Sequence, residues 1–249
     1  MKNYKIVVSY DGTRYKGWQS QKNTDATIEG KIEAVLEKAV GHKVDVIGSG
    51  RTDAGVHAKG QVANFHLEED FSSDALLELL NRYLPEDIAV CSVEEVSERF
   101  HSRFSAVEKI YQYRIHTGRI PEVFERKYVY THMEVLDVDA MQQAAEYMVG
   151  THDFTSFCGN KHMKKSAVRT VYEIRFDVTE EEIKITYRGN GFLQNMIRIM
   201  TGTLLEVGQG KRRPEDMIDI LDAKNREMAG YTAPPQGLSL LKVNYDNAT

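Results

Sequence analysis

Two kinds of apolar periodicity alternate through the first part of this chain. Apolar residues recur at every second position in residues 4–10, 61–67 and 88–96, as they do in half-buried β-strands. They recur at every third or fourth position in residues 28–39 and 76–84, as they do in amphipathic helices. Strands that alternate with helices predict an α+β fold in which helices cover a sheet.

The densest chemistry lies in a glycine-rich run, residues 48–58, with the sequence GSGRTDAGVHA. It joins two alternating segments, residues 44–47 and 61–67, so we expect a loop at the end of a sheet. Glycines allow close backbone approach, and Arg51 can favour the ionised form of the Asp53 carboxylate. An isolated Asp-Ala-Gly is better explained as a surface turn, so the choice between turn and reactive loop depends on the rest of the chain.

The composition of the 249-residue chain is that of an ordinary soluble domain, with 41% hydrophobic and 28% charged residues. No apolar run is long enough to span a bilayer, and the start shows no signal-peptide pattern, so we expect a cytoplasmic protein. The net charge of −5 argues against nonspecific coating of nucleic acid. It is compatible with an RNA enzyme, because phosphate contacts depend on where cations cluster.

The chain has two cysteines, and the sequence around neither of them predicts a disulfide or a metal site. Cys91 ends an apolar run, where we expect a buried and inert thiol. Cys158 lies near His152 and His162, but this set lacks the paired spacing of zinc ligands. We therefore expect no metal.

Two loops mix cations with aromatic residues, a mixture typical of sites that bind phosphates and bases. In residues 11–19, Arg14 and Lys16 are interleaved with aromatic residues that include Trp18. An aromatic loop that packs on its own domain explains this pattern equally well. Further along, Arg103 stands between two phenylalanines in a second such loop.

The second part of the chain resumes the strand and helix pattern, and we place a domain boundary between residues 1–103 and 104–249. Residues 106–117 alternate like a strand and put Tyr111 and Tyr113 on one face, where tyrosines are more often core than functional. The other predicted elements are a helix that begins at Asp137 or Asp139, a hairpin of residues 170–178 and 183–187, a short helix of residues 214–221 and a closing strand of residues 239–245.

One predicted helix, residues 192–207, is apolar nearly all round, which indicates burial on several sides. Arg198 is its only cation. A buried guanidinium without a partner costs on the order of several kcal/mol, so Arg198 should meet a carboxylate or a phosphate. A side chain that extends to the surface is an equally good explanation from the helix alone.

Taken together, these segments resemble the bacterial tRNA pseudouridine synthase A family over almost the whole chain. Residues 50–58 match the family's catalytic loop, and residues 104–113 match the segment with its active-site tyrosine. Residues 191–198 match the motif whose arginine pairs with the catalytic aspartate. The Gly-Trp-Gln of residues 17–19 and the Ala-Pro-x-x-Gly-Leu of residues 233–238 are further family features.

The resemblance implies two similar α/β domains of the ferredoxin or RRM-like type. Their antiparallel sheets would join into one larger sheet, with the active-site cleft between the domains. It also implies an isomerase that converts uridine to pseudouridine at positions 38, 39 and/or 40 of the anticodon stem-loop of tRNA. The family acts as a homodimer, with each tRNA touching both subunits.

Specific residues take roles through the same resemblance. The catalytic residues would be Asp53, Tyr111 and Arg198. The substrate contacts would be Tyr111, Arg51, Arg14, Lys16, Trp18 and Arg103.

The reaction breaks a glycosidic bond and joins C5 of the uracil to the same ribose, so it needs no metal, redox group or cofactor. Asp53 would act as a nucleophile or as a base, and the sequence leaves both open. Arg198 would keep Asp53 ionised, while Arg51 would help it or bind phosphate. Tyr111 would stack on the uracil, which would be flipped out of the RNA helix.

Two other functions are compatible with parts of the sequence. A non-catalytic protein that binds structured RNA explains the aromatic and basic loops but leaves the Asp53 loop without a purpose. A glycoside or nucleoside hydrolase also uses a carboxylate, but most such enzymes need a second one placed opposite. The sequence shows no such partner near Asp53.

Overall fold

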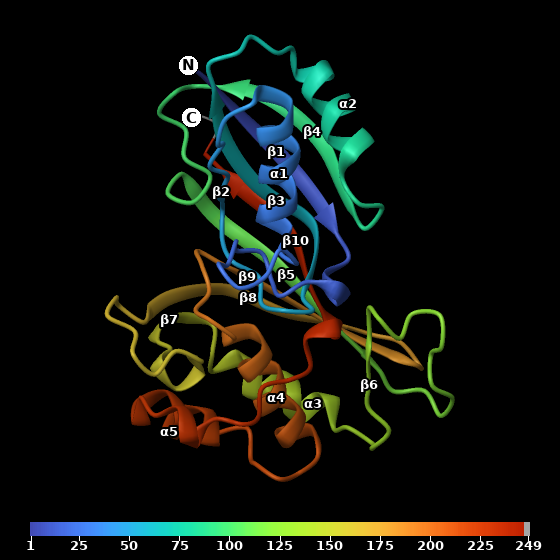
Figure 1. Cartoon of the computed structure of the whole chain (residues 1–249). Helices are drawn as coiled ribbons and strands as arrows, with labels where there is room; N and C mark the ends of the chain where they lie inside the picture. The colour runs from blue at the N-terminus through green and yellow to red at the C-terminus, as the bar shows by residue number, and fades with distance from the viewer. Residues whose placement is uncertain (247–249) are drawn as a thin grey trace. The chain divides into compact units, whose positions relative to one another are not determined.

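The computed structural model describes residues 1–246, which form two compact units (Figure 1). Unit 1 contains Met1–Lys109 and the described residues from Ser239 onward. Unit 2 contains Ile110–Leu238. The closing strand therefore belongs with unit 1, although it falls within the expected second domain, 104–249; the functional domain boundary remains a prediction.

The sheet of unit 1 has the strand order β4-β1-β3-β10. Its strands are β1 (Lys2–Tyr10), β3 (His57–Leu67), β4 (Ile88–Val96) and β10 (Leu238–Tyr245), and the two-residue β2 (Ile47–Gly48) pairs with β3. The central strand β1 pairs antiparallel with both β3 and β4, as expected. β10, which comes from the far end of the chain, pairs with β3 in parallel.

Two helices cover the sheet of unit 1, α1 (Ile28–Val40) and α2 (Ser73–Tyr83) (Figure 1). Thr27 caps α1, since its hydroxyl accepts the Gly30 N–H at 3.3 Å. The helices turn their apolar positions inward, which confirms the spacing predicted from the sequence. The fully buried side chains of these helices and of β1 include Ile28, Ile32, Leu36, Leu76, Leu80, Tyr4, Ile6 and Val8.

Two expectations for unit 1 are wrong in detail. Residues 44–47 were expected as a strand, but only Ile47 of that segment is in β2; Val44 and Val46 are buried without strand pairing. Cys91 is exposed rather than buried. It lies on β4, where side chains alternate between the two faces, and Val90 takes the inward position.

The sheet of unit 2 has the order β5-β9-β8-β7. Its strands are β5 (Ala106–His116), β7 (Gly150–Asp153), β8 (Val168–Val178) and β9 (Glu182–Gly189), and the short β6 (Tyr130–Thr131) pairs in parallel with β5. The expected hairpin is confirmed, with β8 and β9 antiparallel. The α+β class is confirmed as well.

Three helices complete unit 2: α3 (Val138–Glu146), α4 (Met196–Gly208) and α5 (Asp216–Ala223). Asp137 caps α3, which decides between the two expected starts. α4 is buried nearly all round, as predicted, but begins at Met196 instead of residue 192. The reason is Asn195, whose φ of 59° breaks the helical path, so that residues 190–195 stay outside the helix and residues 194–195 form a turn.

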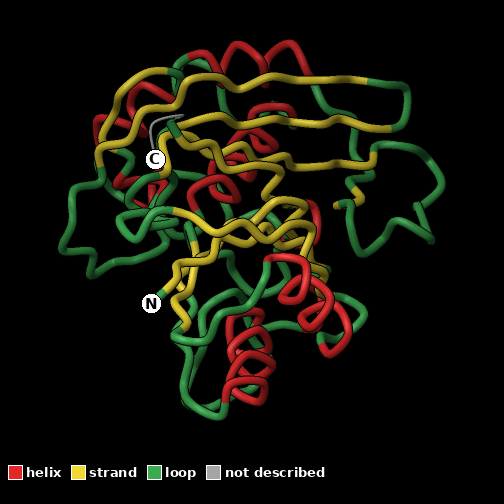
Figure 2. Tube along the Cα trace, turned by 90° about the horizontal axis from the view of Figure 1, so that it is seen from above, coloured by secondary structure: helices red, strands yellow, loops and turns green. Residues whose placement is uncertain are grey.

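A long loop, residues 117–129, projects from unit 2 between β5 and β6, as both views of the chain show (Figures 1 and 2). It exposes apolar side chains, including Ile120 at 80% and Phe124 at 89%. Within residues 1–246, no helix is long and apolar enough to cross a membrane.

Candidate active site

The Asp53 loop, residues 48–58, connects β2 to β3 and is fixed by polar contacts at its first residues. The Ser49 N–H donates to the Val62 carbonyl at 2.7 Å, and Gln61 Nε2 donates to the Gly50 carbonyl at 3.0 Å. Lys109 Nζ donates to the Ser49 carbonyl at 2.7 Å. The expected loop at the end of a sheet is confirmed, and Asp53 is half-buried within it.

A second loop, residues 11–18, supports the Asp53 loop from one side. Trp18 is 1% exposed; its N–H donates to the Thr52 carbonyl at 3.1 Å, and its indole donates to Glu29 at 3.1 Å. A Cβ on Gly48 would come within 2.4 Å of the Trp18 indole nitrogen. Trp18 therefore packs under the Asp53 loop, and in this conformation its ring is not available to a base. Of the two explanations of this aromatic loop, packing on its own domain is therefore the one that holds for Trp18.

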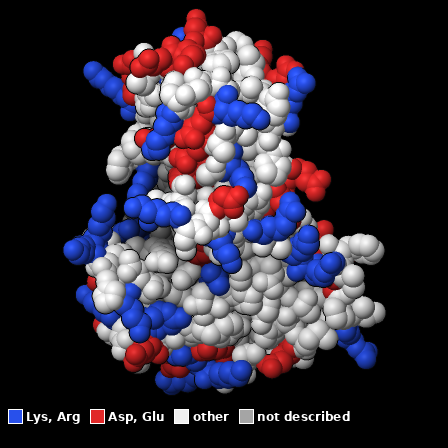
Figure 3. Space-filling model, viewed as in Figure 1, with Lys and Arg blue, Asp and Glu red and all other residues white. Residues whose placement is uncertain are grey.

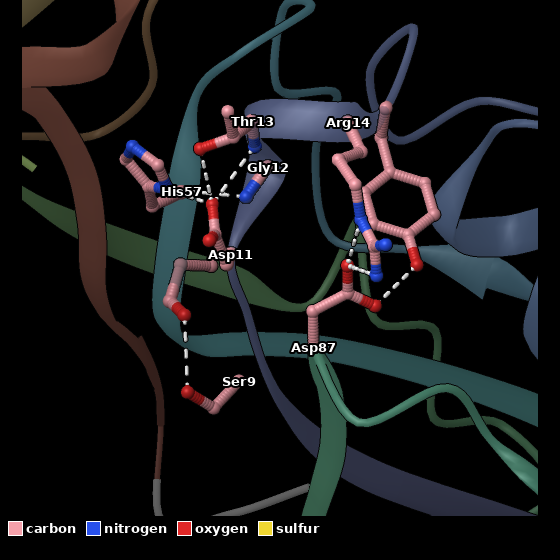
Figure 4. A network of polar contacts seen from close by, with 9 residues as sticks. Ser9, Asp11, Gly12, Thr13, Arg14, His57 and Asp87 are labelled. Atoms are coloured by element: carbon pink, nitrogen blue, oxygen red, sulfur yellow. Dashed lines mark hydrogen bonds and ion pairs between the residues drawn. The ribbon is translucent and has the colours of Figure 1, made fainter. Parts of the chain in front are cut away.

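His57 lies in the Asp53 loop, and no role for it was predicted from the sequence (Figure 4). It is 4% exposed, and its Nδ1 accepts the Gly12 N–H at 3.0 Å and lies 3.3 Å from Asp11 Oδ1. A Cβ on Gly12 would come within 2.0 Å of the Val56 carbonyl oxygen. His57 thus joins the two loops four residues after Asp53. Its place in the glycine-rich motif was the only signal that could have indicated it.

Arg14 is held by Asp87 in the same network (Figure 4). Its Nε and Nη2 donate to Asp87 Oδ2 at 2.9 and 2.6 Å, and the Tyr15 hydroxyl donates to Asp87 Oδ1 at 2.6 Å. The hydrogen bond to Asp87 raises the pKa of Arg14 above its ordinary value. The Arg14 side chain is 66% exposed, so it is oriented by Asp87 while remaining open to solvent.

Three other expected RNA contacts, Lys16, Arg51 and Arg103, are exposed on unit 1. Burial raises the pKa of Glu29, and the charge of Arg51 acts in the opposite direction. Figure 3 shows Lys and Arg intermixed with Asp and Glu on the viewed face, in keeping with the net charge of −5. Phosphate groups would therefore be bound by individual cations on this surface and not by a uniformly positive face.

Tyr111 lies on β5 in unit 2 and is 7% exposed. Its ring meets the Phe192 ring edge to face, with centroids 5.5 Å apart and an interplanar angle of 84°. Phe192 lies in the segment just before α4, in the motif that also contains Arg198. The structure therefore brings two of the motifs predicted from the sequence together inside unit 2.

Arg198 is half-buried near the start of α4 and is held by neutral groups of the same unit. Its Nε donates to the Ala233 carbonyl at 2.7 Å, and its Nη1 donates to Asn195 Oδ1 at 3.2 Å. Asn195 packs in turn on Gly159, where a Cβ would come within 2.5 Å of its amide nitrogen. The left-handed turn at Asn195 thus helps to orient Arg198.

Asp53 belongs to unit 1, and Tyr111 and Arg198 belong to unit 2. Their meeting in one site remains a prediction. Among residues 1–246, no three His, Cys, Asp or Glu side chains are grouped so that they could hold a metal ion.

Comparison with known proteins identifies one family, with matches in both units. The family model described as tRNA pseudouridine synthase matches residues 6–105 and 144–246. Proteins named tRNA pseudouridine synthase A from Brevibacillus brevis and from Bacillus sp. strain KSM-64 are each 48% identical to this chain over 245 residues, covering 98% of it and 100% of each relative. The protein named tRNA pseudouridine synthase A 1 from Clostridium tetani is 47% identical, with the same coverage.

Among solved structures, a chain of a Cbf5-Nop10-Gar1 complex aligns over 95% of this chain and 48% of its own length, at 12% identity and a TM-score of 0.37. A similarity this weak supports no argument. The family model and the full-length relatives decide the question: this chain belongs to the tRNA pseudouridine synthase family and is an isomerase that acts on tRNA.

Proposed function

We propose that this enzyme isomerises uridine at positions 38, 39 and/or 40 of the anticodon stem-loop, with Asp53, Tyr111 and Arg198 as its catalytic residues. The observation that carries the proposal is the match of residues 50–58 to the catalytic loop of the family, in a chain that aligns with its relatives over their whole length. The two alternatives, a non-catalytic RNA-binding protein and a hydrolase, do not agree with membership of an isomerase family.

Asp53 supplies the carboxylate of the reaction. It attacks the ribose as a nucleophile or removes a ribose proton as a base, and the bond between N1 and C1′ breaks in either case. The uracil then turns and C5 bonds to the same C1′, while Asp53 leaves the ribose or returns the proton that it took. The C5 proton is lost and N1 gains one, so the product is an isomer of the substrate. Arg198 keeps the carboxylate ionised and oriented. The hydrogen bonds from Arg198 to Ala233 and Asn195 support this role, because a guanidinium fixed at two points holds its direction.

Tyr111 stacks on the flipped uracil and holds it while the base is detached. Its edge-to-face contact with Phe192 supports this assignment, since the ring is held on one side by a second aromatic group. For Tyr111→Phe we expect unchanged tRNA affinity, because the ring stays. A lower turnover in this variant would assign the hydroxyl to proton transfer at C5, whereas unchanged turnover would leave only the stacking role.

Arg51, Arg14, Lys16 and Arg103 contact the tRNA, and their exposure in unit 1 supports this part of the proposal. Trp18 contributes through the loop that it supports, since its ring is buried. The enzyme works as a homodimer in the cytoplasm. It needs no cofactor, because the bond that forms joins atoms of the same nucleotide.

One experiment tests the assignment of Arg198 against a simpler role. Arg198→Lys keeps the charge but loses the Nε donor and the planar fork. We expect a large loss of turnover with tRNA affinity mostly retained. Equal losses in both would show that Arg198 contacts a phosphate instead.

A further inference from the structure

One loop of unit 1, residues 97–105, turns one phenylalanine inward and another outward. Phe100 is 5% exposed and packs against the Tyr245 ring, with centroids 5.1 Å apart. Phe104, four residues later, is 75% exposed. A single exposed apolar side chain is common on protein surfaces, so the exposure of Phe104 alone does not mark a site.

The loop that carries Phe104 is anchored to its unit by Ser102, which is fully buried. The Ser102 N–H donates to Asn64 Oδ1 at 2.9 Å, and the Tyr245 hydroxyl donates to the Ser102 carbonyl at 2.7 Å. The Ser102 hydroxyl also donates to the Ile47 carbonyl. These partners lie on three strands, β3, β10 and β2, so the loop is fixed to the sheet at this residue.

His101 supports the exposed ring directly. The rings of His101 and Phe104 have centroids 4.2 Å apart. His101 Nδ1 accepts the backbone N–H groups of Arg103 at 3.2 Å and Phe104 at 3.3 Å, and the Ser105 N–H donates to the His101 carbonyl at 2.9 Å. Phe104 is thus held outward by a second ring and by the backbone, which lowers the entropy lost when a ligand covers it.

The neighbour of this ring is a cation, since Arg103 is also exposed. A rigid aromatic face beside a guanidinium binds an unpaired nucleobase by stacking and its phosphate by charge. The family acts on tRNA. We propose that Phe104 is a stacking platform for an unpaired nucleobase of the tRNA, with Arg103 on an adjacent phosphate. This inference rests on the proposed function in one respect, since Arg103 is one of the tRNA contacts proposed there.

The sequence allows a direct optical test, because Trp18 is the single tryptophan of the chain and is 1% exposed. Phe104→Trp adds an indole at the platform, and Phe124→Trp adds one at an 89% exposed site of unit 2 as a matched control. Saturating full-length tRNA should reduce acrylamide quenching of the first indole about threefold and leave the control nearly unchanged. Equal protection of both, or of neither, would overturn the proposal.

Affinity gives the second test. Phe104→Ala should raise the Kd for tRNA about 5- to 100-fold, the range expected for one base stacked on an aromatic side chain, while Phe104→Tyr stays within about twofold of wild type. The slope of log Kd against log salt should not change in Phe104→Ala, because no charge is lost, and should fall by about one in Arg103→Gln. An unchanged Kd in Phe104→Ala would overturn the proposal.

The alternative to a nucleobase is a second copy of the chain that covers the exposed Phe104 ring. Sedimentation of Phe104→Ala without tRNA decides between them: wild-type assembly supports the platform, and a changed oligomeric state would assign the ring to a protein interface. The proposed function fails separately. If wild type forms no pseudouridine at positions 38–40, those positions are wrong, while the protection of the Phe104→Trp indole from acrylamide by full-length tRNA still tests the platform.

Discussion

Arg198 and Ala233 exchange two hydrogen bonds. The Ala233 N–H donates to the Arg198 carbonyl at 3.0 Å, and Arg198 Nε donates to the Ala233 carbonyl at 2.7 Å. The segment of residues 229–234 is thereby fixed to α4 at the proposed catalytic arginine. The carbonyl of the next residue, Pro234, accepts a hydrogen bond from the Tyr113 hydroxyl at 2.7 Å. Tyr113, which the sequence could assign only to the core, thus holds the segment that holds Arg198.

Tyr113→Phe removes this hydroxyl and leaves the buried ring in place. We expect a loss of stability of about 1 kcal/mol and a fall in kcat of about fivefold, with KM near wild type, because Arg198 loses part of its support. Steady-state kinetics on tRNA would measure the change in kcat and KM, and chemical denaturation the change in stability.

A double-mutant cycle controls for a purely structural effect of Tyr113→Phe. If Tyr113 acts through Arg198, the substitution should lower kcat little or not at all in an Arg198→Lys background. Full additivity of the two losses would contradict the link between the residues.

Gly202 sets how closely the 229–234 segment approaches α4. A Cβ at this position would lie 1.9 Å from the Tyr231 carbonyl oxygen, so Gly202→Ala must push the segment away. We expect a loss of about 1–3 kcal/mol in the free energy of unfolding, together with reduced turnover. Chemical denaturation measures the first. Gly191→Ala is the control, because its Cβ would meet only ordinary contacts at 3.9 Å; a similar loss there would remove the explanation.

Lys16 and Arg14 should differ in their contribution to tRNA binding, although they lie in one loop. Asp87 already pairs with Arg14, whereas Lys16 extends into solvent. Lys16→Gln should reduce the slope of log Kd against log salt by about one, and Arg14→Gln should reduce it less. Filter binding at several salt concentrations measures both slopes. Equal slopes for the two variants would show that Asp87 does not compete with phosphate.

Two histidines should affect the pH dependence of stability with opposite signs. Burial lowers the pKa of His132 below its ordinary value of 6.5. As pH falls through 6.5, the unfolded chain gains this proton more readily than the folded chain, so the folded state loses stability. His132→Gln should therefore lose less stability than wild type between pH 7.5 and pH 5.5, as measured by urea denaturation.

His42 is the counterpart for that comparison. Its hydrogen bonds with the Lys43 carbonyl and with Glu69 raise its pKa, so its contribution is present below the unfolded pKa and is lost as pH rises. His42→Gln should make the loss of stability on acidification larger than in wild type. Shifts of the same sign in both variants would contradict the two assignments.

Much of the fold could be predicted from the sequence, because its signals are local. The apolar spacing of α1 and α2, and the alternation of β4, come from one face meeting a core. The start of α4 could not be predicted, since it depends on the left-handed backbone of Asn195 inside an apolar run. The parallel pairing of β10 with β3 also escaped, because it joins segments far apart in the chain.

The candidate site shows the same division. The Asp53 loop could be identified because its motif is contiguous. The roles of His57 and Tyr113 could not, because each depends on a partner distant in sequence, Gly12 for one and Pro234 for the other. Trp18 could be taken for an RNA contact because a loop sequence does not reveal which ring faces the core.

The most direct test of the central claim is the mapping of pseudouridine along the anticodon arm of unmodified tRNA, by carbodiimide modification, after incubation with wild type or Asp53→Asn. No metal or nucleotide is added. We predict signal at positions 38, 39 or 40 with wild type and a loss of at least about 1,000-fold with Asp53→Asn, while the fold remains stable. Multiple-turnover modification by Asp53→Asn would contradict the account, because Asp53 would not be the catalytic carboxylate.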